Sequence, residues 1–155
     1  MSPHRPRRTR ILALQALYQL DSGRAWEEVS AFLGEPGQPV GQAALTLVEA
    51  IWAGRATLDE TLADHLQDWS VARLGTVERA VLRLALYELL YEPEVPVAVV
   101  IDEAVELVKR FASERSGALV NAVLDKAKVL RDERSKAGGP AGPSTGSGPR
   151  AAPRG

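Results

Sequence analysis

The sequence predicts an all-helical protein, and three observations support this prediction. Apolar residues recur every three or four positions along most of the chain, a spacing that places them on one face of a helix. Glycine and proline interrupt this pattern at the intervals expected for turns between helices. The apolar residues are mainly leucine, valine and alanine, which suits helix packing, and no run alternates long enough to predict a strand.

The turn residues divide the chain into about seven expected helices. Gly23 follows the first helix, where glycine favours a left-handed C-cap, and Gly54 follows the third. The segment Gly34–Pro39 holds two glycines and two prolines and separates the second helix from the third. The expected ranges are Arg7–Ser22, Ala25–Leu33, Val40–Ala53, Leu58–Trp69, Val77–Tyr91, Val97–Phe111 and Ser116–Arg134.

The fifth expected helix, Val77–Tyr91, is apolar on nearly every side. Such a helix is covered by neighbours all round, so we expect it at the centre of the fold. Thr76 is the expected N-cap of this helix, because its hydroxyl can accept a hydrogen bond from the first turn. Pro93 and Pro96 separate it from the sixth helix.

Composition bounds the class of protein. A chain of 155 residues can form one domain with a hydrophobic core, expected over residues 1–135. The absence of cysteine excludes disulfides and thiolate metal sites. No signal-peptide pattern or membrane-spanning run is evident, so we expect a cytoplasmic protein without a membrane partner. Residues 136–155 are mostly glycine, proline, alanine and serine and are predicted to form a disordered tail.

Charge is distributed unevenly although the net charge is only −1. Residues 1–10 contain four arginines and no acid, whereas all 20 acidic residues lie between positions 11 and 135. A basic end on an acidic body argues against a generally basic surface. The distribution favours one localised anion-binding patch.

Arg7, Arg8 and Arg10 lie at the start of the first expected helix. The helix dipole is positive there, so each cation is unfavourable by about 0.3–1 kcal/mol, and folding alone gives no reason for it. A phosphate ligand would explain the arginines. Further along the helix, Gln15 and Tyr18 add an amide and an aromatic ring, the groups that contact bases of single-stranded RNA. A solubilising basic end with a half-buried tyrosine is the alternative.

Other polar residues admit structural explanations. Arg79 and Arg83 form a like-charge pair one turn apart and need carboxylate partners or an external anion. The acids of the next helix, Asp102, Glu103 and Glu106, are the expected partners, and direct RNA contact is the alternative. Asn121 shares a helix face with Asp125, which suits a polar contact or an internal hydrogen bond equally.

Catalytic motifs are not evident. His4 and His65 are far apart, and no phosphate-binding glycine loop or nucleophile motif occurs. Asp64, His65 and Asp68 are too few for a convincing metal site, and a solvated helix face explains them better. We therefore expect no enzyme activity, no cofactor and no metal.

Four segments in this order resemble the NusB family of transcription antitermination factors: RRTRILALQALYQLD, TVERAVLRLALYELL, VPVAVVIDEAVELVKRF and LVNAVLDK. The resemblance covers Arg7 to Leu130. It implies two packed three-helix bundles that bind boxA leader RNA together with NusE, a small-subunit ribosomal protein. Family members act with RNA polymerase and other Nus factors, notably on ribosomal RNA operons.

The resemblance also implies two sets of site residues. The arginine-rich segment, the helix after it and the region Glu114–Asn121 correspond to the family's RNA-binding parts. These parts supply Arg7, Arg8, Arg10, Gln15, Tyr18, Arg115, Leu119 and Asn121. The surfaces near the NusE contact supply Glu78, Arg79, Arg83, Asp102, Glu103 and Glu106.

The chain departs from the family pattern near the second RNA region. Leu119 replaces a frequent aromatic residue and cannot stack on a base, and Ala122 replaces a frequent glycine. Arg115 stands where some relatives have an acid, which could strengthen a phosphate contact. Three alternatives remain open: the NusB-like domain of a ribosomal RNA methyltransferase, a helical protein-interaction module, and a homodimer that masks the RNA face. The methyltransferase needs a further domain, for which the chain leaves no room if it is complete.

Overall fold

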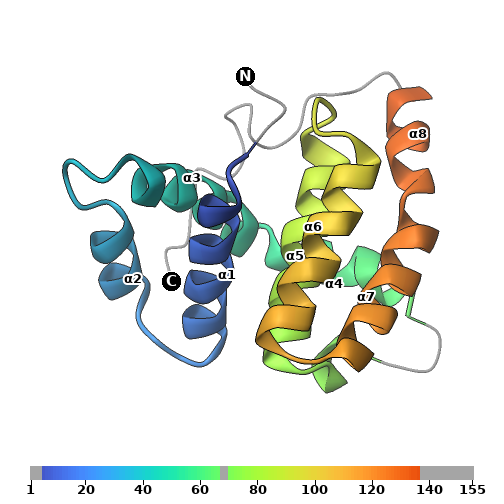
Figure 1. Cartoon of the computed structure of the whole chain (residues 1–155), viewed down its shortest axis with the longest axis horizontal. Coiled ribbons are helices and arrows are strands. Elements are labelled where there is room, and N and C mark those ends of the chain that lie inside the picture. Colours follow the sequence, from blue (N-terminus) through green and yellow to red (C-terminus); the bar gives the residue numbers. More distant parts are fainter. Residues whose placement is uncertain (1–4, 67–69, 137–155) are drawn as a thin grey trace.

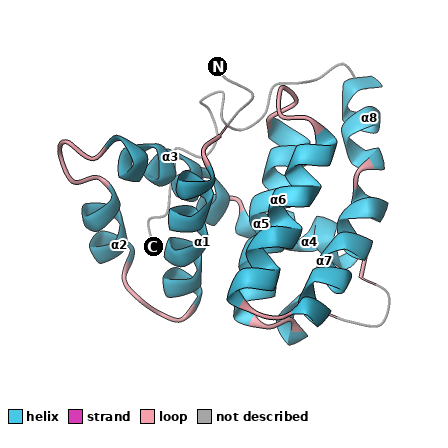
Figure 2. Cartoon of the chain, viewed as in Figure 1, coloured by secondary structure: helices cyan, strands magenta, loops and turns pink. Residues whose placement is uncertain are grey.

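The described part of the chain, residues 5–66 and 70–136 of a computed structural model, contains eight α-helices, one short 3-10 helix and no strand (Figure 1, Figure 2). The all-helical prediction is therefore confirmed. The helices are α1 (Arg7–Asp21), α2 (Trp26–Leu33), α3 (Pro39–Ala53), α4 (Arg55–Ala63), α5 (Thr76–Tyr91), α6 (Val97–Phe111), α7 (Glu114–Ala127) and α8 (Val129–Lys136), with the 3-10 helix η1 at Val71–Arg73.

The helices form two groups that meet along α1 and α5. Helices α1, α2 and α3 pack on one another, whereas α4, α6, α7 and α8 pack around α5 (Figure 1). This arrangement is consistent with the expected pair of bundles. Ten consecutive residues of α5, Ala80–Leu89, are buried, which confirms the predicted central helix. None of the described helices is long and apolar enough to cross a membrane.

Most helix boundaries fall within three residues of those expected, and the larger differences are at the fourth and the last expected helix. The last expected helix is divided after Ala127 into α7 and α8, and α8 includes Lys136, the first residue of the expected tail. The fourth helix was expected to reach Trp69 but ends at Ala63, since residues 64–66 are described and are not helical. Residues 67–69 and the other tail residues, 137–155, lie outside the described residues.

Helix α5 begins one residue and α7 two residues earlier than predicted. The N-cap of α5 is Gly75 rather than Thr76, and its N–H donates to the Glu78 carboxylate at 2.9 Å. The Ser113 hydroxyl caps α7 by accepting from the Ser116 N–H at 3.0 Å. Gly23 has a φ of +103°, which confirms the left-handed position expected after the first helix.

Gly41 marks the closest approach of α3 to the end of α2. A Cβ at this position would lie 2.5 Å from the carbonyl oxygen of Leu33, a backbone atom that can move only with its helix. We expect Gly41→Ala to lower the free energy of unfolding by about 1–3 kcal/mol in a urea titration. Gly54→Ala is the control, because its Cβ would meet only an ordinary contact at 3.4 Å. Equal losses in the two variants would contradict this explanation.

Candidate RNA interface

The arginines at the start of α1 point in two directions. Arg10 points inward, is 3% exposed, and donates to both carboxylate oxygens of Glu88 on α5 at 3.2 and 3.1 Å. Arg5 also contacts Glu88 and lies 2.7 Å from a carboxylate oxygen of Glu92. The prediction that Arg10 faces RNA is therefore wrong, because its guanidinium is already enclosed by protein.

Glu88 explains why these arginines point inward. Its side chain is 1% exposed, and a buried carboxylate is costly unless cations and hydrogen-bond donors surround it. Burial alone would lower the pKa of Arg5, but the nearby carboxylates of Glu88 and Glu92 outweigh it and raise that pKa. For the Glu92 carboxylate, burial is the dominant effect and raises the pKa. This ion-pair cluster fixes the first turn of α1 against α5.

Arg7 and Arg8 point outward. Arg7 forms a two-pronged hydrogen bond with Glu103 on α6, at 3.0 and 2.9 Å, while its side chain stays 53% exposed. Hydrogen bonding in this pair raises the pKa of Arg7 and lowers that of Glu103. Arg8 is exposed and makes no ion pair with any described residue. The Arg8 guanidinium is therefore open to an external anion, whereas the Arg7 guanidinium is engaged by the Glu103 carboxylate.

The expected base-contacting residues of α1 lie at a surface groove. Gln15 and Tyr18 line it together with Val77 of α5 and Phe111 of α6, and Tyr18 is 44% exposed. An amide and an accessible ring beside apolar walls form a surface on which a planar base can stack and pair. The predicted placement of these two residues on one accessible side of the helix is confirmed.

The second expected region lies on α7, which starts three residues after Phe111. Arg115 and Asn121 are exposed there, whereas Leu119 is half-buried and packs against the hydrophobic core. A half-buried leucine offers a ligand only a small apolar surface. The basic and amide groups of α7 are therefore the accessible ones.

Arg79 and Arg83 form ion pairs with carboxylates, as expected, but their partners are not the acids of α6. Arg79 lies 2.6 Å from Asp21 at the end of α1, and Arg83 donates to both oxygens of Asp59 on α4 at 2.8 Å. Their carboxylate partners are on α1 and α4 because these helices, and not α6, cover that side of α5. The prediction that Asp102, Glu103 and Glu106 supply the partners is wrong.

The remaining candidates take varied positions. Glu78 caps α5 and contacts the Ser116 hydroxyl, so it joins α5 to α7. Asp102 and Glu106 are exposed on α6. The ring nitrogen Nδ1 of His65 lies 3.0 Å from the Thr61 carbonyl oxygen, a local helix contact. Over residues 5–66 and 70–136, no group of three histidine or acidic side chains is placed to hold a metal, and His4 and Asp68 lie outside those ranges.

The sequence did not predict the role of two residues, Glu88 and Arg131, that hold α5 and its neighbours in place beneath the surface. Glu88 is the clearest case, since an acid inside the apolar run of α5 signals a buried ion pair. Arg131 is another: its guanidinium donates to the carbonyl oxygens of Leu89 at 3.0 Å and Glu88 at 2.9 Å, at the end of α5. Nothing in its local sequence distinguishes it from a surface arginine.

Two helical groups that meet along α1 and α5, with arginine, amide and aromatic side chains on the accessible face of α1, define a small α-helical protein whose first helix presents these groups to solvent. The chain belongs to the NusB family, whose family model matches residues 7–128. It is 46% identical over 140 residues to the transcription antitermination protein NusB of Xanthomonas euvesicatoria, covering 87% of this chain and 86% of that protein. The NusB of Saccharopolyspora erythraea is 42% identical over 130 residues, covering 81% and 87%.

Solved structures give the same result. NusB of T. maritima superposes with a TM-score of 0.73 at 34% identity, over 85% of this chain and 98% of that one. A chain from a complex of the antitermination factors NusB and NusE with double-stranded RNA gives 0.68 at 29% identity, over 79% and 95%.

Proposed function

We propose that this protein is a non-enzymatic transcription antitermination factor. It binds boxA-type leader RNA in the cytoplasm together with the NusE ribosomal protein and, with other Nus factors and RNA polymerase, supports transcription of ribosomal RNA operons. The observation that carries the proposal is the outward face of α1, where two exposed arginines precede an amide and an accessible tyrosine ring. Membership of the NusB family supports it, as does the similarity to a NusB from a complex with NusE and RNA.

The proposed RNA contacts divide by chemistry. Arg7 and Arg8 bind phosphates, because planar guanidinium groups match phosphate oxygens. Tyr18 stacks on a base and Gln15 reads a base edge. Exposed side chains of α7 extend the contact with RNA. Arg10 does not touch RNA and acts only by positioning α1. The side chains of α7 that we propose to contact RNA are those of Arg115 and Asn121. Leu119 can contact only the edge of a base, because it has no ring for stacking.

The proposed NusE contact uses the outer face of α6. Asp102 and Glu106 are exposed there and can face a basic ribosomal protein. Glu78, Arg79 and Arg83 are engaged within the protein, so we assign them a supporting role beneath the contact surface. Glu103 of α6 connects the proposed NusE surface with the proposed RNA surface, because its carboxylate forms an ion pair with Arg7.

The function is tested by RNA binding with and without the NusE-type protein. Fluorescence anisotropy is measured with a labelled boxA-like strand and with a scrambled strand of the same composition. We expect tighter binding of the boxA-like strand, a further gain when NusE is present, and weakening as salt is raised. Equal affinity for the two strands, with and without NusE, would rule out boxA recognition. Failure to co-purify with NusE would leave only a bare RNA binder.

A further inference from the structure

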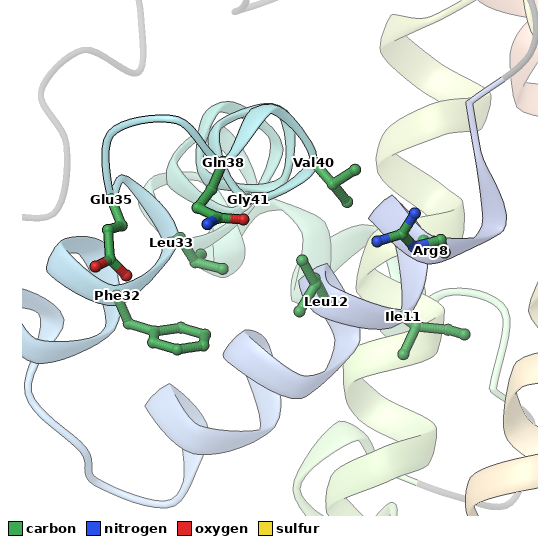
Figure 3. A pocket seen from close by; sticks show the side chains of 9 residues that line it. All are labelled: Arg8, Ile11, Leu12, Phe32, Leu33, Glu35, Gln38, Val40 and Gly41. Atoms are coloured by element: carbon green, nitrogen blue, oxygen red, sulfur yellow. The ribbon is translucent and has the colours of Figure 1, made fainter.

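A second groove flanks the exposed face of α1, on the side opposite the groove at Tyr18. It is enclosed by α1, α2 and α3 and has a volume of about 450 Å³ (Figure 3). Its walls are apolar, with Leu12 on α1 and Phe32 on α2, and its rim carries Arg8, Glu35 and Gln38. At 100° per residue, Gln15 stands about midway between Leu12 and Tyr18 around α1. The exposed ridge of α1 therefore separates this groove from the one at Tyr18.

Phe32 is the unusual residue of this groove. Phe32 is an apolar residue that is 66% exposed. Across the described ranges, the exposed large apolar residues are Tyr18, Phe32 and Val129, and Phe32 is the most exposed of the three. Two of these three, Tyr18 and Phe32, line the two grooves along α1, one in each, although a largely exposed ring contributes little to folding.

The size and chemistry of the groove indicate its occupant. Stable protein partners bury broad apolar areas, whereas here a single ring is exposed in a pocket of the size that holds one or two planar groups. Figure 3 shows the Phe32 ring extending from α2 into the opening, with the Arg8 guanidinium at the opposite end. The ring suits stacking and the Gln38 amide suits pairing with a base edge. The Arg8 guanidinium, which has no ion pair with any residue the structure describes, suits a phosphate.

We propose that this groove is a second base-binding subsite for single-stranded RNA. One nucleotide stacks on Tyr18 in the first groove, the backbone crosses the ridge of α1 where Arg8 holds a phosphate, and a following base stacks on Phe32. The Glu35 carboxylate repels phosphate but accepts from exocyclic amino groups, so it favours an amino-bearing base in this position. The subsite rests on the proposed RNA-binding function and extends the RNA path from α1 onto α2.

The test compares Phe32→Leu, which keeps an apolar side chain but removes the ring, with Val129→Ala, which removes exposed apolar surface far along the chain on α8. Affinity for a labelled single-stranded boxA-like RNA is measured by anisotropy, with and without NusE. We expect Phe32→Leu to bind about fivefold or more weakly and Phe32→Trp to retain affinity, since loss of base stacking is costly and any ring can supply it. Val129→Ala should bind as the parent does. RNA carrying 5-iodouracil should cross-link to the peptide that contains Phe32.

The outcomes separate this proposal from the function on which it rests. If the parent protein fails to bind the RNA even with NusE, the proposed function fails and the subsite with it. If the parent binds, Arg8→Ala weakens binding and Phe32→Leu does not, only the subsite is wrong. If Phe32→Leu instead changes the sedimentation coefficient or the affinity for NusE while RNA binding is intact, the groove docks a protein, and the proposal is overturned.

Discussion

The Arg10→Ala variant is expected to lose about 3 kcal/mol of its free energy of unfolding. The substitution leaves the Glu88 carboxylate, which is 1% exposed, with Arg5 as its remaining cation. A buried charge that loses a partner keeps its desolvation cost but loses much of its compensation. A guanidinium chloride titration followed by circular dichroism measures the loss as a lower midpoint with an unchanged slope.

Two variants make this result specific. Arg24→Ala removes an arginine whose ion pair with Glu28 is exposed, and such a pair contributes at most about 1 kcal/mol. Combining Arg10→Met with Glu88→Leu removes both buried charges and should recover most of the stability lost in Arg10→Ala. If Arg10→Ala is no less stable than Arg24→Ala, the buried ion pair does not hold α1 in place.

The second large effect is on RNA binding. The double variant Arg7→Ala, Arg8→Ala is expected to bind boxA-like RNA about tenfold or more weakly, because two charged contacts to phosphate are lost. The slope of log affinity against log salt should become shallower by about 1.4, since each phosphate contact on a single strand contributes about 0.7. Both side chains are exposed, so the unfolding midpoint should change little. Affinity is measured at several salt concentrations.

A matched charge change tests the same contacts in the opposite direction. Glu103→Gln removes the carboxylate that holds Arg7, so we expect tighter RNA binding. Glu60→Gln makes the same change on an exposed residue of α4 and should leave affinity nearly unchanged. An unaltered salt slope in the double variant, together with equal affinities for the two glutamine variants, would show that RNA binds elsewhere.

Helical periodicity predicted the fold well because it is a local property. The apolar run of α5 identified the central helix, and the exposure of Gln15 and Tyr18 followed from their side of α1. The same periodicity could have placed Arg10 correctly, since it lies three, four and seven residues before Ala13, Leu14 and Leu17 on the buried face. Charge at the helix start alone does not distinguish Arg10, which faces the core, from Arg7 and Arg8, which face solvent.

The ion-pair partners could not be predicted in the same way. Arg79 and its partner Asp21 are 58 residues apart, and Arg83 and Asp59 are 24 apart. Such pairs depend on which helix covers which side of α5, a property of tertiary packing that spacing within one helix does not contain. The groove at Phe32 was missed for the same reason, because its walls come from three helices.

The inward-pointing arginines, Arg5 and Arg10, affect the rates at which RNA is expected to associate and dissociate. Because Arg5 and Arg10 fasten the first turn of α1 to α5, the outward side chains stand on backbone that is already ordered before RNA arrives. Little conformational entropy is then lost on association, and the protein docks as a rigid body. Discrimination between RNA strands should therefore appear mainly in the lifetime of the complex, with association rates that differ far less from strand to strand.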